Sequence, residues 1–337
     1  MSDSPPDLST RWLGLDLPNP LVASSSPLTG DVETLVRLEQ AGVAAVVLPS
    51  LFQEQLEHEE FQFGTLHHTG AQSTPEASDF FPGLGGQPSA DAMELATAAC
   101  EALSIPVVFS LNGVTHDGWA RYARRAVEAG VDAIELNLLM VPTDPSTSAA
   151  DIERRLCDEV AAVRGAVSVP ITVKLGGAFT APLHVVEQLT RAGADGVSVI
   201  NRFPEPDLDL ERMEVVPHLE PSRPAEVRAV LRWIALLSPH AQGSLAATTG
   251  AHAPEDLVKL LLAGADVVMT ASALLLHGPE HAGVLLDGLR AWMTEHEYVS
   301  VKQMKGSMNH AHCPTPEGYE RLNYMRSLVT YTMPEQG

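Results

Sequence analysis

Four times in this chain of 337 residues, a helical stretch ends in Ala-Gly and runs directly into a short apolar stretch. Glycine suits the left-handed residue that closes a helix. The apolar stretches are rich in valine and isoleucine, as expected of parallel strands buried on both faces. These junctions lie at residues 41–45, 129–133, 192–196 and 263–267. Their recurrence predicts alternating helices and strands, and therefore an α/β fold with a parallel sheet.

Completing the alternation along the chain gives eight strands and eight helices. The strands are expected at 20–23, 44–48, 107–111, 133–137, 171–175, 196–200, 244–247 and 267–270. The helices are expected at 31–40, 91–103, 117–128, 149–167, 181–191, 225–237, 255–262 and 282–296. Eight such units predict a (β/α)8 TIM barrel.

The length of the chain predicts additions to a single barrel domain that spans residues 1–337. A typical barrel has about 250 residues, and its extra segments lie in the loops that follow the strands. Two stretches rich in proline, glycine and charge are the expected insertions, at about 51–90 and 201–224. A helical tail is expected at about 297–337.

Charge and cysteine content exclude several classes of partner and site. The net charge of −22 argues against nucleic acid and anionic membranes, because both attract clustered lysine and arginine. The amino terminus lacks the basic and apolar regions of a signal peptide, so a cytoplasmic location is expected. Cys100, Cys157 and Cys313 are widely separated and favour neither a disulfide framework nor a metal site.

Polar residues at the strand ends are the first candidates for a functional site, because these ends converge on one mouth of a barrel. They include one cation, Lys174, which lies among apolar residues and therefore needs an anionic partner. A purely structural pairing with Glu135 is the alternative to a role in the site. The other candidates are Ser24, Ser25, Ser50, Asn112, Asn137, Asn201, Thr248, Thr249, Gly250, Ala271 and Ser272.

The loops after the last two expected strands are typical of a phosphate site. Small residues at 248–250 and 270–273 allow backbone N–H groups to approach an anion. Small residues also occur in such loops for tight packing alone. Phosphate, a lysine and several amides together suggest a phosphorylated planar cofactor or a phosphosugar.

Several stretches resemble, in the same order, the dihydroorotate dehydrogenase family of FMN barrels. They are Asn-Pro-Leu-Val-Ala-Ser at 19–24, Ile-Glu-Leu-Asn at 134–137, Val-Lys-Leu at 173–175, Val-Ile-Asn-Arg at 199–202 and the paired phosphate loops. The chain more closely resembles the bacterial dihydroorotate dehydrogenase-like proteins, which share the stretches at 110–114, 142–145 and 274–281. The resemblance extends from about residue 8 to residue 331.

The resemblance implies FMN as cofactor and a role for each matching residue. Ala23, Ser24 and Ser50 would lie along the flavin ring, and Asn112 and Asn137 would bind its polar edge. Lys174 would face the pyrimidine edge, where negative charge gathers on reduction, and Asn201 would lie beside the substrate. The resemblance thus makes Lys174, Asn137 and Asn201 the catalytic set. The phosphate would be held by Thr249, Gly250, Ala271 and Ser272.

The chain departs from the family at the base that removes a proton from dihydroorotate. In fumarate-type members the loop after the fourth strand reads Asn-Leu-Ser-Cys-Pro-Asn, and its cysteine is the base. Here residues 137–142 place Met140 at that position, and a thioether is no useful proton acceptor. A family lysine is replaced by Pro49, and the substrate-binding Leu-Pro-Asn corresponds to residues 83–85. Dihydroorotate is therefore not the expected substrate.

A few other residues are candidates for acid, base or substrate binding. His67, His68 and His116 lie in loops near the expected mouth and would titrate near neutrality, although exposed loop histidines are the alternative interpretation. Arg202 directly follows Asn201 and could hold an anionic substrate. A salt bridge with an acidic residue such as Glu205 is the alternative for Arg202.

The leading hypothesis is an FMN-dependent oxidoreductase that acts on CH–CH or similar bonds of a small planar substrate by hydride transfer. The resemblance implies pyrimidine metabolism and a homodimer. One alternative is a non-catalytic or electron-relay flavoprotein that works with a partner redox protein. Another is a Schiff-base aldolase that uses Lys174 on a phosphosugar. Bound flavin would make the protein yellow, whereas an aldolase would be colourless.

Overall fold

The computed structural model describes residues 4–52, 88–112, 116–138, 140–202 and 205–331. Within this part of the chain, eight parallel strands form a closed barrel, because β4 pairs with β6. The strands are β3 (Leu21–Ala23), β4 (Ala45–Val47), β6 (Val107–Asn112), β7 (Ala133–Asn137), β8 (Ile171–Gly176), β9 (Gly196–Asn201), β12 (Ser244–Thr248) and β13 (Val267–Thr270). Each lies within one residue of its expected bounds, and the predicted TIM barrel is confirmed.

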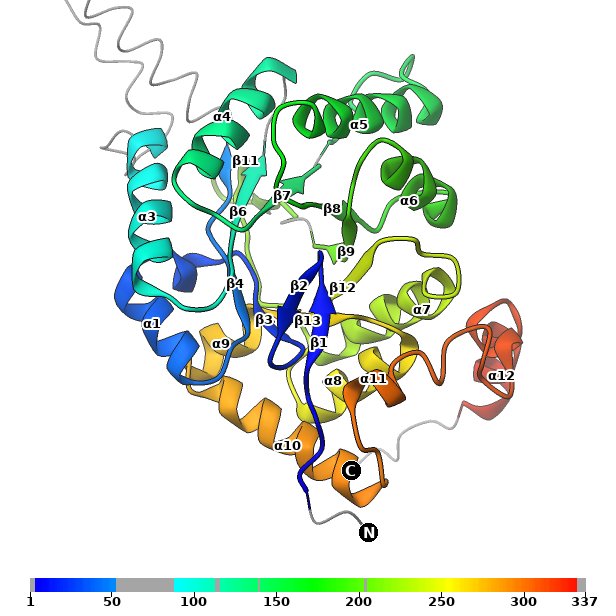
Figure 1. Cartoon of the computed structure of the whole chain (residues 1–337). Coiled ribbons are helices and arrows are strands. Elements are labelled where there is room, and N and C mark those ends of the chain that lie inside the picture. The colour runs from blue at the N-terminus through cyan, green and yellow to red at the C-terminus, as the bar shows by residue number, and fades with distance from the viewer. Residues whose placement is uncertain (1–3, 53–87, 113–115, 139, 203–204, 332–337) are drawn as a thin grey trace, which may run out of the picture.

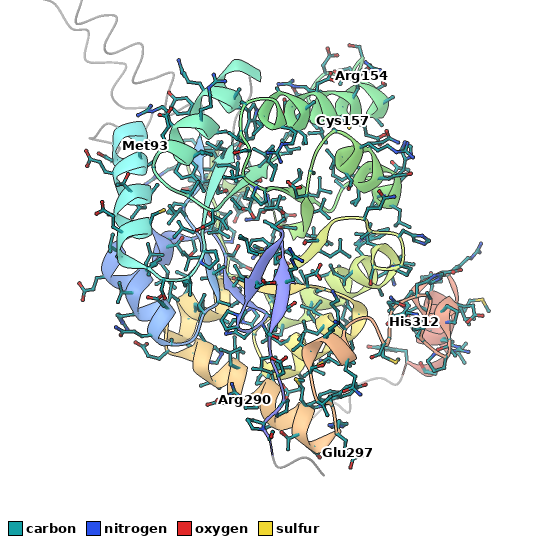
Figure 2. All side chains as sticks on the ribbon, viewed as in Figure 1. Met93, Arg154, Cys157, Arg290, Glu297 and His312 are labelled. Carbon is teal, nitrogen blue, oxygen red and sulfur yellow. The ribbon has the colours of Figure 1, made fainter. Side chains whose placement is uncertain are left out.

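The expected helices surround this ring of strands (Figure 1). They are α1 (Val32–Gln40), α3 (Pro88–Ala102), α4 (His116–Glu128), α5 (Ala149–Arg164), α6 (Pro182–Arg191), α7 (Val227–Leu237), α8 (Pro254–Ala263) and α10 (His281–Glu295). Charged side chains such as Arg154 and Arg290 lie on the outer side of the helices (Figure 2). Among the described residues, none of the helices has both the length and the apolar character that crossing a bilayer requires.

The structure also contains elements that were not predicted. A short helix, α9 (Ser272–His277), follows β13, and β5 (Leu51–Phe52) pairs beside β6. The insertion at 201–224 contains an antiparallel hairpin of β10 (Asp207–Asp209) and β11 (Glu214–Val216). The tail contains α11 (Val301–Met304), a 3-10 turn at Pro316–Tyr319 and α12 (Leu322–Thr330). Most of the other predicted insertion, 53–87, lies outside the described residues.

The four junction glycines have the left-handed backbone that the sequence predicts. Their φ angles are +99° at Gly42, +99° at Gly130, +114° at Gly193 and +116° at Gly264. Packing adds a second constraint at some of them. A Cβ on Gly264 would lie 2.0 Å from Ser238 Oγ, whereas a Cβ on Gly130 would lie 3.7 Å from Cys100 Cβ, an ordinary contact.

An aspartate two residues after three of these glycines joins the new strand to its neighbour. Each carboxylate accepts a hydrogen bond from a backbone N–H at the start of the adjacent strand. The pairs are Asp132 with Val107 N at 2.8 Å, Asp195 with Ile171 N at 2.8 Å and Asp266 with Leu245 N at 2.7 Å. In the first unit that position is Ala44, and Asn19 Oδ1 instead accepts from Leu21 N at 2.9 Å. These carboxylates satisfy backbone donors at the amino ends of the strands.

A small hairpin closes the amino-terminal end of the barrel. It consists of β1 (Thr10–Trp12) and β2 (Leu15–Leu17) and lies across the ring of strands in Figure 1. Trp12, Leu13 and Leu17 are buried in one cluster with residues that begin strands, such as Ala133 and Val267. The hairpin therefore leaves the carboxyl ends of the strands as the open mouth.

We expect Gly264→Ala to destabilise the protein more than Gly130→Ala does. Both variants force a left-handed alanine, which costs about 1–2 kcal/mol. Only Gly264→Ala adds a clash, with Ser238, and overpacking costs about 1–3 kcal/mol more. Urea unfolding followed by circular dichroism measures both. Equal losses at the two positions would show that the close packing at Gly264 has no energetic effect.

Candidate functional site

A pocket of about 530 Å³ lies at the carboxyl ends of the strands. Ten of the residues predicted from the strand ends line it: Ser24, Ser25, Lys174, Asn201, Arg202, Thr248, Thr249, Gly250, Ala271 and Ser272. The remaining wall includes Leu219 to Ser222, from the end of the second insertion, and Leu275 and Leu276 from α9. The mouth of the barrel thus combines a cation, amides, hydroxyls and an apolar side.

Strand alternation explains which side chains enter the barrel. Ala133 packs against the amino-terminal hairpin, so Glu135 and Asn137, at intervals of two along β7, face the same side. In the parallel register, Glu135 lies beside Thr172 and Asn137 beside Lys174. The interior therefore changes from apolar at the closed end to polar at the mouth.

Lys174 has the anionic partner that its burial requires. Its Nζ lies 3.7 Å from Glu135 Oε1, and Glu135 is fully buried. Ser110 Oγ donates to the same carboxylate oxygen at 3.2 Å, and Ser50 Oγ lies 2.8 Å from Ser110 Oγ. The ion pair between Lys174 and Glu135, which the sequence suggests as the structural alternative to a role in the site, is therefore present. Since Lys174 also lines the pocket, it can serve both as a partner of Glu135 and as a cation at the mouth.

Among the described residues, the second carboxylate oxygen of Glu135, Oε2, is not hydrogen-bonded, unlike Oε1. Oε2 is buried and has no hydrogen-bond partner within the described part of the protein. Unsatisfied buried carboxylate oxygens are costly, so they call for a functional explanation or an ordered water.

Two strand-end amides hold each other in place. Asn201 Nδ2 donates to Asn137 Oδ1 at 2.7 Å, which links the ends of β7 and β9. Asn137 is only 7% exposed. Both amides are thus fixed in orientation next to Lys174.

Arg202 has a different partner from the one predicted. Its Nε lies 3.4 Å from Glu226 Oε1, and its Nη1 donates to the carbonyl oxygen of Glu220 at 2.5 Å. The salt bridge considered as the alternative for Arg202 is thus present, but with Glu226 in place of Glu205. Arg202 turns toward the segment before α7 because that segment offers both a carboxylate and a backbone carbonyl.

The expected phosphate loop after β12 has an unusual backbone. Thr249 and Gly250 have φ angles of +87° and +81°. A β-branched residue with positive φ is rare, and Thr249 is held there by a 2.9 Å hydrogen bond from its Oγ1 to Ile200 O. A Cβ on Gly250 would lie 2.3 Å from Val227 N, so this position requires glycine. Such local strain is common at binding sites.

Ser222 was not predicted, yet it connects the two expected phosphate loops. Gly250 N–H donates to Ser222 Oγ at 3.3 Å, and Ser222 N–H donates to Ser272 Oγ at 2.9 Å. Ser222 belongs to the insertion and does not directly follow a strand of the barrel, and no local motif marks it.

Other predicted site residues lie outside the pocket lining. Ala23, Asn112 and Asn137 end their strands and Ser50 directly precedes β5, but none of the four is in the lining. Met140 is half-buried and packs against the core. His116 begins α4, but its side chain lies outside the described part of the structure, as do His67, His68 and residues 83–85.

Two of the cysteines, Cys100 and Cys157, are poor candidates for a catalytic base. Burial, together with the charge of Asp132, raises the pKa of Cys100 to about 11. Burial likewise raises the pKa of Cys157. Both thiols are therefore protonated near neutrality and poor proton acceptors.

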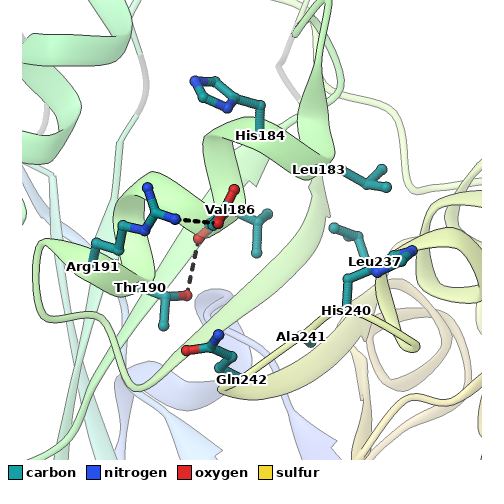
Figure 3. A pocket seen from close by; sticks show the side chains of 10 residues that line it. Leu183, His184, Val186, Thr190, Arg191, Leu237, His240, Ala241 and Gln242 are labelled. Atoms are coloured by element: carbon teal, nitrogen blue, oxygen red, sulfur yellow. Dashed lines mark hydrogen bonds and ion pairs between the residues drawn. The ribbon is translucent and has the colours of Figure 1, made fainter.

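A second pocket, of about 440 Å³, lies on the outside of the barrel. Its lining comes from α6 and from the end of α7 with the turn that follows it (Figure 3). Arg191 there is paired with Glu187 on the same helix. Because no strand end contributes to this pocket, the functional site is placed at the mouth.

No protein-family model matches the chain, but comparison with known proteins finds distant relatives that are named as dehydrogenases. It is 24% identical over 312 residues to the catalytic subunit of dihydroorotate dehydrogenase B (NAD(+)) of Thermoplasma acidophilum, covering 89% of this chain and 98% of that one. It is 23% identical over 274 residues to dihydroorotate dehydrogenase A (fumarate) of Lactobacillus delbrueckii subsp. bulgaricus, covering 77% and 85%.

A third relative has a different named substrate. The chain is 21% identical over 333 residues to the chloroplastic dihydropyrimidine dehydrogenase (NADP(+)) of Arabidopsis thaliana, covering 90% of this chain and 78% of that one. The agreement covers most of each protein and accompanies the barrel and the motifs at its strand ends. Over most of its length, the chain is similar to enzymes named as dihydroorotate dehydrogenases.

Proposed function

We propose that this protein is an FMN-dependent oxidoreductase that transfers hydride between flavin and a small planar substrate. The observation that carries the proposal is that Lys174, Asn201 and the loops after β12 and β13 all line the same pocket. Similarity to these relatives supports an oxidoreductase, since they are named as dehydrogenases of dihydroorotate or dihydropyrimidines.

The donor set of the pocket fits FMN. FMN has a ring system with a polar edge at one end and a phosphate group at the other. Lys174 and the Asn137–Asn201 amide pair would hold the polar ring edge, and the loops around Gly250 and Ser272 would hold the phosphate. A volume of about 530 Å³ lies within the usual range of roughly 300–1,000 Å³ for cofactor pockets.

The bound flavin would supply the hydride chemistry, and the protein residues would supply binding and electrostatics. Lys174 places a positive charge at the mouth without any reorganisation during the reaction, which is an efficient way to stabilise a developing anion. Glu135 fixes Lys174 in position, and Ser110 holds Glu135. The amide pair orients groups at the ends of β7 and β9.

The position of Met140 argues for a substrate other than dihydroorotate. Oxidation of dihydroorotate requires a base to remove a proton, and a thioether side chain does not supply one. Met140 instead packs against the core. A reaction that needs no base at this position, or electron exchange with a redox partner, is consistent with that change.

The purified protein is expected to be yellow and to release one FMN per chain on denaturation. The measurement is the visible absorption spectrum, followed by chromatography of the released cofactor. Riboflavin in place of FMN would contradict the phosphate assignment. A colourless protein whose Lys174 is trapped by borohydride with a phosphosugar would instead establish the aldolase alternative.

Lys174→Met and Glu135→Gln are expected to move the flavin reduction potential in opposite directions. Loss of the cation destabilises the anionic reduced flavin, by about 3 kcal/mol or roughly 60 mV for a two-electron couple. Loss of the carboxylate leaves the lysine charge uncompensated and raises the potential. The variant that carries both substitutions leaves no unpaired charge. It therefore controls for the free-energy cost of burying one charge without its partner. If neither single variant changed the flavin reduction potential, Lys174 and Glu135 would have only a structural role.

The wild-type protein is expected to oxidise dihydroorotate negligibly, because a positioned base contributes about 10²–10⁴-fold and Met140 provides none. Met140→Cys alone is not expected to restore turnover, since Pro49 also differs from the family residue. Anaerobic flavin bleaching measures both proteins, with other dihydropyrimidines and small carbonyl acids as test substrates. Rapid bleaching of the wild type by dihydroorotate would identify a base elsewhere. Bleaching by none of these compounds would favour the electron-relay alternative.

A further inference from the structure

Ser222 joins the expected phosphate loops to a third segment of the mouth. Its side-chain oxygen accepts from Gly250 N–H at 3.3 Å, and its backbone N–H donates to Ser272 Oγ at 2.9 Å. Ser222 also lines the pocket between these loops. The phosphate end is therefore built from three chain segments, of which one comes from the insertion.

The hydroxyl of Ser222 has hydrogen-bonding capacity beyond the bond from Gly250. A serine hydroxyl provides one donor and two acceptor lone pairs. At 3.3 Å, the bond from Gly250 is longer than the usual 2.7–3.2 Å for N–H···O. An anionic oxygen in the pocket would compete well for this N–H, since hydrogen bonds to charged acceptors are stronger.

His252 lies in position to orient the hydroxyl. Its Nε2 is 3.1 Å from Ser222 Oγ. The backbone at His252 is anchored on both sides: its N–H donates to Asp256 Oδ2 at 3.1 Å, and its carbonyl oxygen lies 3.2 Å from His281 Nε2. A proton on Nε2 would be donated to Ser222 Oγ, which leaves the serine O–H to donate into the pocket.

We propose that the Ser222 hydroxyl, positioned by His252, binds the phosphate group of the cofactor and makes the pocket prefer FMN to riboflavin. This inference rests on the proposed function. It assigns phosphate recognition to a side chain of the insertion, in addition to the backbone groups of the two strand-end loops. Ser222 would contact the phosphate, and His252 would be a positioning residue.

The test compares the dissociation constants of FMN and riboflavin for the flavin-free protein, measured by quenching of flavin fluorescence. Ser222→Ala is expected to weaken FMN binding about 10- to 100-fold, as for loss of a hydrogen bond to a charged group, and to leave riboflavin binding unchanged. Ser222→Thr keeps the hydroxyl and should keep the preference. Ser146→Ala, at an exposed serine outside the pocket, is the matched control and should keep it too.

The role of His252 is tested by a conservative and a disruptive replacement. His252→Gln retains a side-chain N–H donor at a similar distance and should preserve the preference for FMN. His252→Phe fills the space without a donor and should reduce that preference several-fold. The same loss in both variants would contradict the proposed donation from His252 to Ser222.

The outcomes separate this inference from the function on which it rests. If the wild type binds FMN and Ser222→Ala retains the same FMN preference, the role of Ser222 is wrong and the proposed function stands. An equal loss of FMN and riboflavin binding in Ser222→Ala would show a structural role and would also overturn the inference. A wild-type protein that binds neither flavin would overturn the proposed function itself.

Discussion

The buried ion pair of Lys174 and Glu135 is the interaction on which the mouth of this barrel depends. Glu135 has no exposure and Lys174 is only 8% exposed, so removing either partner would leave a buried charge, at a cost of about 3–5 kcal/mol. The pair can exist because the apolar hairpin and the first inward residues fill the opposite end. Apolar packing thus fills the amino-terminal end of the barrel. The charged pair lies toward the carboxyl-terminal mouth, where a ligand can bind.

The fold could be predicted from the sequence because the residues that mark the ends of its helices and the starts of its strands are adjacent in the chain. A glycine that closes a helix and an apolar run that follows it are read from adjacent residues, and strand bounds agree to within one residue. The hairpin over 10–17 could not be predicted in this way. Its strands have three residues each, too few to show a period of two, and their burial arises from packing against distant strands.

The candidate site could be predicted only where its residues follow strands. Lys174, Asn201 and Gly250 come directly from strand ends, and barrel geometry brings them to one pocket. Ser222 and the Arg202–Glu226 pair depend on how the 201–224 insertion folds back over the mouth. The conformation of such an insertion is set by long-range contacts, here to Ser272 and Gly250, and therefore leaves no periodic signal.

The proposed cofactor site and the position of the expected base belong to different parts of this barrel. The loops proposed to hold phosphate follow β12 and β13, whereas the resemblance assigns the base to the loop after β7. Met140 makes none of the hydrogen bonds that join Ser222, Gly250 and Ser272. Because different strands position the two regions, a barrel of this kind can keep the proposed cofactor pocket while the chemistry at the other side of the mouth changes.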